Sequence, residues 1–196
     1  MAEPPLTLRP ATERDRDAII YLLDEAPAWL RSMNTDQWAK PWRTEDDRRE
    51  RVTRDLRAGK TWIVEDTSMP VATFTADREH NHQEIPVWPR WAQRERAVYV
   101  CRLAVRHSYS GRQLGAALLD WIALTARERD GARYIRVDVW STNRQLQSYY
   151  ERLGFKLHSH SRFADYPSGA LYQKPTRDIV PQHPPMFRVL DAGEAS

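Results

Sequence analysis

Residues 103–116 read LAVRHSYSGRQLGA and residues 143–155 read NRQLQSYYERLGF, and these two stretches carry most of the information on the fold. The first starts as the end of an apolar strand and passes through a glycine-containing turn into a helix predicted over 111–129. A further strand is predicted over 134–139. The second stretch follows Ser141 and Thr142, either of which can cap a helix, and Gly154 ends that helix.

Outward from this centre, the periodicity predicts a helix from Thr12 to Leu30, with a kink or break at Pro27, and a charged helix over 45–57. Alternating and apolar runs predict the strands, over 6–10, 61–65, 71–76, 97–105, 155–157 and 170–172. The order of elements indicates an α/β (α+β) domain with a sizeable sheet. We expect this domain over residues 1–174 and a Pro-rich C-terminal arm over 175–196.

The composition excludes several classes of protein. The chain has 196 residues with 30 Lys and Arg against 27 Asp and Glu, and the interspersed charges argue against nucleic-acid binding. The single cysteine, Cys101, excludes an internal disulfide framework and a cysteine-based zinc site. His80 and His82, like His158 and His160, have metal-compatible spacing, but no carboxylate or cysteine pattern completes a site, so we expect no metal. Without a membrane-length apolar run or a secretory signal, a soluble cytoplasmic protein is expected.

The turn at 110–116 is the first candidate site. Amides at a helix N-terminus are unpaired and carry the positive end of the helix dipole, so they suit a phosphate or diphosphate. Gly111 and Gly115 would let the backbone approach such an anion, and Arg112 adds charge at the rim. A glycine before a helix is also common in a plain turn, so this feature alone does not decide between the two interpretations.

The combination of features resembles the GCN5-related N-acetyltransferase (GNAT) superfamily over roughly residues 6–173. Residues 103–105 are similar to the strand end before the family's acyl-coenzyme A loop, and 110–115 stand in the place of its Gln/Arg-x-x-Gly-x-Gly/Ala motif. Asn143, Tyr150 and the pair Gly154-Phe155 resemble the second signature, Asn-x6-Tyr-x3-Gly-Phe. The resemblance implies a mixed central sheet with two parallel strands that splay apart, flanked by about four helices.

Two positions depart from the family's pattern. Ser110 stands where Gln or Arg is usual, and Gln113 stands where the central glycine is usual. In the family, the backbone of that glycine faces a phosphate oxygen. Gln113 can therefore replace the glycine only if the glutamine side chain points away from the phosphate. Arg112 could compensate for weaker diphosphate binding.

The resemblance implies that acetyl-CoA is the co-substrate. Backbone groups of the strand end would pair with the pantetheine arm, the turn would hold the diphosphate, and Asn143 would bind the arm from the other side. The coenzyme-binding residues implied in this way are Leu103, Ala104, Val105, Ser110, Gly111, Arg112, Gln113, Leu114, Gly115, Ala116, Asn143 and Tyr150.

Tyr150 matches the family's general acid, which protonates the leaving thiolate; the alternative is an ordinary core aromatic. A general base is harder to find, because Tyr99 and Cys101 stand where relatives often carry Glu or His. Asp138 could bind the ammonium or relay its proton through water, although a surface salt bridge is an equally good account. Glu95 and His82 are weaker candidates. Trp38 and Trp42 are expected to line the acceptor pocket. Trp29, Trp88 and Trp91 are further candidates for it, although packing explains Trp29 equally well.

The resemblance therefore predicts an N-acetyltransferase (an acyltransferase enzyme) that moves an acetyl group directly from the thioester to a primary amine of a small molecule. Two alternatives remain open: a catalytically silent acyl-CoA-binding regulatory module, and an acetyltransferase acting on a protein N-terminus or lysine. No nucleic-acid or membrane partner is expected, and formation of a homodimer stays open.

Overall fold

The computed structural model describes residues 6–32, 44–78, 87–163, 166–180 and 185–190, with the backbone alone over 26–32. Its helices and 3-10 turns are η1 (Glu13–Asp15), α1 (Arg16–Ser32), α2 (Glu45–Arg57), α3 (Arg90–Gln93), η2 (His107–Tyr109), α4 (Leu114–Asp130), α5 (Arg144–Arg152) and η3 (Thr176–Asp178). Its strands are β1 (Leu6–Pro10), β2 (Thr61–Asp66), β3 (Met69–Asp77), β4 (Ala97–Val105), β5 (Tyr134–Val139), β6 (Lys156–His160), β7 (Ala170–Pro175) and β8 (Phe187–Val189).

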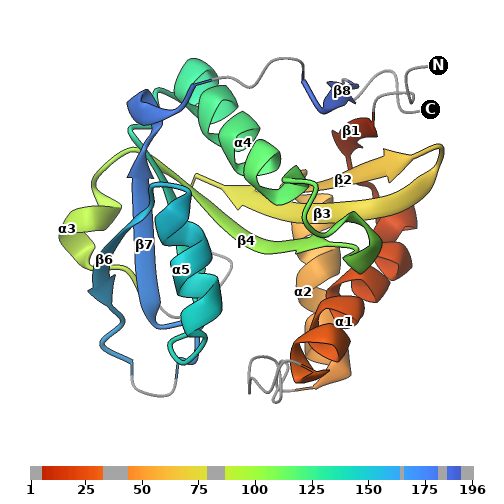
Figure 1. Cartoon of the computed structure of the whole chain (residues 1–196), viewed down its shortest axis with the longest axis horizontal. Coiled ribbons are helices and arrows are strands. Elements are labelled where there is room, and N and C mark those ends of the chain that lie inside the picture. Colours follow the sequence, from red (N-terminus) through yellow and green to blue (C-terminus); the bar gives the residue numbers. More distant parts are fainter. Residues whose placement is uncertain (1–5, 33–43, 79–86, 164–165, 181–184, 191–196) are drawn as a thin grey trace.

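The strands form one mixed sheet in the order β6-β7-β5-β4-β3-β2-β1-β8. In Figure 1, α4 and α5 lie in front of the sheet, and α1 and α2 lie behind its other half. The predicted mixed α/β fold, with parallel strands at its centre and helices on both faces, is confirmed.

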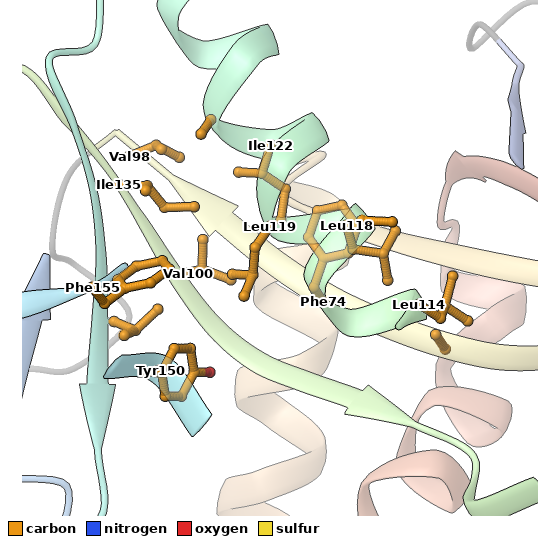
Figure 2. Packing of buried hydrophobic residues seen from close by; sticks show 14 of the residues in the cluster. Phe74, Val98, Val100, Leu114, Leu118, Leu119, Ile122, Ile135, Tyr150 and Phe155 are labelled. Atoms are coloured by element: carbon orange, nitrogen blue, oxygen red, sulfur yellow. The ribbon is translucent and has the colours of Figure 1, made fainter. Parts of the chain in front are cut away.

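Both faces of the sheet are buried, and neighbouring residues of one strand show this. Val64 of β2 packs in the core under α4, whereas the preceding Ile63 packs with α1 and α2. Figure 2 shows the first of these cores, where Leu118 and Ile122 of α4 project toward the strands. Because successive side chains of a strand point to opposite faces, each strand presents one set of residues to each helical layer.

The two parallel strands β4 and β5 pair over only part of their length. Their register runs from Ala97 opposite Tyr134 to Val100 opposite Val137 and then stops. Beyond this point β4 stays with β3, and β5 stays with β7. The two strands therefore part at their carboxyl ends, and we call this place the fork.

A β-bulge in β4 lies just past the fork. Thr75 is opposite Cys101 and Thr73 is opposite Ala104, so one residue of β3 faces two residues of β4. Arg102, in the bulge, has the left-handed φ of 51°, and its buried guanidinium forms an ion pair with Asp55 of α2. Bulges bend a strand and increase its twist, so this one turns β4 away from β5.

The structure differs from the sequence predictions at three places. The helix predicted from 111 begins at Leu114, and part of the segment before β4, for which no helix was predicted, forms the short helix α3. Part of the C-terminal arm adds β8 to the sheet beside β1, and Phe187 packs edge-on against Trp121. The division into a domain and an arm stays a prediction.

Candidate active site

The segment between β4 and α4 is fastened to the sheet at its start. The Arg106 amide donates to the Val71 carbonyl at 2.8 Å, and the hydroxyl of Tyr109 hydrogen-bonds to Asp66 in the β2–β3 hairpin. The guanidinium of Arg112 lies 4.8 Å from the centre of the Tyr109 ring. These contacts hold the turn in one position relative to the end of β4.

The turn itself fits an anion. The first hydrogen bond of α4 runs from the Ala117 amide to the Gln113 carbonyl at 3.0 Å, so the amides of residues 114–116 precede the hydrogen-bond ladder of the helix. Gly111 has a φ of 78°, and a Cβ built on it meets nothing within 4 Å. A diphosphate can therefore approach this backbone closely, and the positive end of the α4 dipole favours it there.

Gln113 stands in place of the family's central glycine and takes a backbone conformation that suits glycine. It is the N-cap of α4 and has φ 60° and ψ 13°, the left-handed conformation. Its side chain makes no capping hydrogen bond. Glycine is favoured at this position because it adopts that conformation without a Cβ clash. Gln113 keeps the turn geometry but at a conformational cost.

Gln113→Gly is therefore expected to raise the free energy of unfolding by about 0.5–1 kcal/mol, since relief of the left-handed strain exceeds the extra entropy that glycine loses. Urea denaturation measures this change. Ala58→Gly is the matched control: Ala58 ends α2 with an ordinary φ of −80°, so glycine there should not stabilise. A loss of stability in Gln113→Gly would mean that the glutamine side chain makes stabilising contacts.

Tyr150 lies in the core between α5 and the strands. It is 8% exposed, and its ring packs edge-on against Phe155 at 5.3 Å between centroids. Its hydroxyl points away from that ring (Figure 2) and makes no hydrogen bond to the described residues. Burial raises the pKa of Tyr150 well above its usual range, so at neutral pH the hydroxyl holds its proton.

Asn143 is the N-cap residue of α5. Its side-chain oxygen accepts a hydrogen bond from the Leu146 amide at 2.9 Å and so caps α5. This cap fixes where the helix begins, and thereby the direction in which Tyr150, two turns later, leaves the helix. Contact of Asn143 with the pantetheine arm stays a prediction.

Asp138 is the first residue of β5 beyond its last pair with β4. Its neighbours Val137 and Val139 pack in the core under α4 and α5, so the Asp138 carboxylate faces the opposite side of the sheet. It accepts hydrogen bonds from the Trp88 indole at 2.7 Å and the Tyr166 hydroxyl at 3.0 Å. Asp138 therefore lies at the fork, held by two aromatic residues.

Two other titratable residues near Asp138, Glu95 and Cys101, are less suited to act as the general base. Arg136, fully buried, forms its ion pair with Glu95 and a hydrogen bond with the Tyr99 hydroxyl at 2.9 Å. Glu95 is thus tied to an arginine. Burial raises the pKa of the Cys101 thiol to about 11, which keeps it protonated and poorly nucleophilic at neutral pH.

Sequence analysis named Trp88 as a candidate for the acceptor pocket but connected neither Trp88 nor Tyr166 with Asp138. Trp88 precedes α3 and Tyr166 precedes β7, and nothing local marks either as a neighbour of residue 138. It also missed Glu25 of α1, whose carboxylate accepts from the His107 amide at 2.9 Å. Trp38, Trp42, His80 and His82 lie outside the described residues. Among the residues described, no group of three or more His, Cys, Asp or Glu could hold a metal ion, and no helix has the length and apolarity to cross a membrane.

Comparison with known proteins identifies the class. A model of the acetyltransferase (GNAT) family matches residues 28–155. "Uncharacterized N-acetyltransferase YesJ" from Bacillus subtilis is 27% identical over 154 residues, which cover 75% of this chain and 79% of that protein.

Solved structures share the fold. A GNAT-family acetyltransferase from Listeria monocytogenes has a TM-score of 0.70 at 20% identity, covering 87% of this chain and 94% of its own. The PaiA N-acetyltransferase from Thermoplasma acidophilum, solved in complex with coenzyme A, has a TM-score of 0.63 at 16% identity, covering 87% and 98%.

The chain belongs to the GNAT family and is an N-acetyltransferase, as its sequence resemblance predicts. The family match spans β4 and β5, which form the fork. It also includes the turn before α4 and α5 through Phe155.

Proposed function

We propose that this protein transfers an acetyl group from acetyl-CoA directly to the primary amine of a small molecule. The observation that carries the proposal is the fork between β4 and β5. It has the amide-rich turn and Tyr150 on the α4 and α5 side, and Asp138 on the other side. Coenzyme and acceptor can then approach the fork from opposite faces of the sheet.

The residues present fit the coenzyme. Past the fork, none of the described strands pairs with the backbone of Leu103, Ala104 and Val105 on the β5 side, so this backbone can pair with an amide-containing arm. The turn over 110–116 offers amides and an open glycine to the diphosphate. Acetyl-CoA supplies the activated acetyl group when bound.

Tyr150 supplies the proton that the departing thiol needs. Its raised pKa keeps the phenol protonated through the neutral range, and a positioned phenol is a suitable donor to a thiolate.

Asp138 meets the acceptor. Its carboxylate, oriented by Trp88 and Tyr166, attracts an ammonium group and takes up its proton, directly or through a water molecule. An ionised carboxylate accepts hydrogen bonds through both oxygens, which suits an ammonium donor. The tryptophans Trp38 and Trp42 are proposed to line the rest of the acceptor pocket.

The test of this function has two stages. Saturating coenzyme A, at about 100 times its Kd, should stabilise the protein by about 2.7 kcal/mol in thermal unfolding. Release of free thiol from acetyl-CoA is then measured over a panel of small amines, peptides and an amine-free control. Thiol release with peptides but not small amines would indicate a protein acetyltransferase; binding without release would indicate a silent acyl-CoA-binding module.

Asp138→Asn should lower kcat/KM for the amine by about 100-fold. The amide keeps one acceptor oxygen for the Trp88 indole and can donate to the Tyr166 oxygen, but it neither attracts the ammonium nor takes its proton. The Kd for coenzyme A should stay the same. Steady-state kinetics measure the first quantity, and calorimetry measures the second. Asp130→Asn, which alters a carboxylate paired with Arg78 at the far end of α4, is the control. Unchanged kinetics in Asp138→Asn would contradict the role of Asp138.

A further inference from the structure

The consecutive residues Tyr149 and Tyr150 of α5 lie in different surroundings. Their rings meet edge-on at 5.4 Å between centroids, but successive residues of a helix point about 100° apart. Tyr150 is buried in the core, whereas Tyr149 is half-buried and only borders it. The Tyr149 side chain extends across to the start of α4.

The Tyr149 hydroxyl lies close to Gly115. A Cβ built on Gly115 would lie 3.1 Å from the hydroxyl oxygen of Tyr149 and 3.8 Å from a methyl carbon of Val105. The hydroxyl therefore reaches the first turn of α4, beside the end of β4. A side chain at position 115 would therefore crowd this oxygen.

The Tyr149 hydroxyl is equipped to donate a hydrogen bond. Burial, with a smaller effect from Asp120, raises its pKa above the ordinary value, so the phenol is neutral and protonated at neutral pH. Within the described residues it makes no hydrogen bond. A protonated phenol beside Gly115 adds a side-chain donor to the first turn of α4, whose backbone amides are also donors.

We propose that the hydroxyl of Tyr149 donates a hydrogen bond to the diphosphate of coenzyme A, and that Gly115 is glycine to make room for this hydroxyl. The proposal rests on the proposed function, because it needs the coenzyme to lie at the turn before α4. It gives Tyr149 a coenzyme-binding role that differs from that of a packing aromatic. It also differs from the idea that Gly115 serves only to let the anion approach the backbone.

Tyr149→Phe is the first test. Removing the oxygen while keeping the ring should weaken coenzyme A binding by about tenfold, which corresponds to about 1.4 kcal/mol. Calorimetric titration with coenzyme A measures the Kd. Tyr134→Phe is the matched control, since Tyr134 is a half-buried tyrosine at the opposite end of β5, and its Kd should equal that of the wild type. An unchanged Kd in Tyr149→Phe overturns the proposal.

A double-mutant cycle with Gly115→Ala tests the second half. With Tyr149 present, the added methyl group is crowded by the hydroxyl and should weaken coenzyme A binding by about tenfold. In the Tyr149→Phe background the oxygen is gone, so Gly115→Ala should have little further effect. Additive losses would mean that the methyl group obstructs the anion itself, and they would overturn the assignment of Gly115.

Phosphorus NMR of the bound coenzyme identifies the contact. Between wild type and Tyr149→Phe, the diphosphate signals should shift while that of the ribose phosphate stays in place. A shift confined to the ribose phosphate overturns the proposal. A wild-type protein that does not bind coenzyme A at all would instead contradict the proposed function, so the two failures are distinguishable.

Discussion

Replacing Tyr150 by phenylalanine is expected to lower kcat by about 100-fold or more, while the Kd for coenzyme A stays nearly unchanged. Phenylalanine fills the same space beside Phe155, so the packing survives and only the proton donor is lost. The hydroxyl of Tyr150 makes no hydrogen bond to the described residues, so its removal leaves none of them without a partner. Rapid measurement of thiol release gives kcat, and calorimetry gives the Kd.

The neighbouring variant Tyr149→Phe makes this prediction sharper, because it is expected to weaken coenzyme A binding and to leave kcat nearly unchanged. The wild-type pH profile adds a second check. Since burial raises the pKa of Tyr150 above the ordinary value of about 10, its acid form persists through the neutral and mildly alkaline range. No loss of kcat from this group is expected below that pH. An unchanged kcat in Tyr150→Phe would refute the acid role.

Replacing Asp55 by alanine is expected to lower the free energy of unfolding by about 3–5 kcal/mol. The side chains of Asp55 and Arg102 are each only 5% exposed, so the variant leaves a buried guanidinium without its carboxylate. The guanidinium also hydrogen-bonds to Thr75 at 3.3 Å, a contact too weak to replace an ion pair. Urea denaturation followed by tryptophan fluorescence measures the change.

Asp17→Ala is the control for Asp55→Ala. Asp17 forms an ion pair with Arg49, and their side chains are 72% and 42% exposed, respectively. Such exposed pairs contribute no more than about 1 kcal/mol to the free energy of unfolding. The two variants should therefore differ by several-fold in their effect. Equal, small losses would mean that water reaches the Asp55–Arg102 pair and that the bulge in β4 does not depend on it.

Much of the fold was predictable from the sequence. The strands around 97–105 and 134–139 and the helix that ends at Gly154 were recognised because hydrophobic periodicity and helix-ending glycines act within a few residues. The start of α4 was placed three residues too early. Gln113 takes the left-handed conformation there, and nothing in its residue type announces it. Part of the C-terminal arm joins the sheet as β8, a pairing that depends on β1 far away in the chain.

The candidate site was predictable in part. Tyr150 and the turn over 110–116 were found because they belong to spaced motifs, and their roles stay predictions. The partners of Asp138 could not be found, because Trp88 lies 50 residues away in the chain. Trp38 and Trp42 lie outside the described residues, so their part in the acceptor pocket is untested.

By itself, the sequence determined the family, the order of the helices and strands other than α3 and β8, and the positions of the turn and the tyrosine pair, because these features depend on residues close together in the chain. The tertiary structure alone decided which side of the sheet Asp138 faces, that Arg102 pairs with Asp55, and that Gly115 lies against the Tyr149 hydroxyl. These contacts join separate elements of the chain. They follow from sheet register and helix packing, which many distant residues set together.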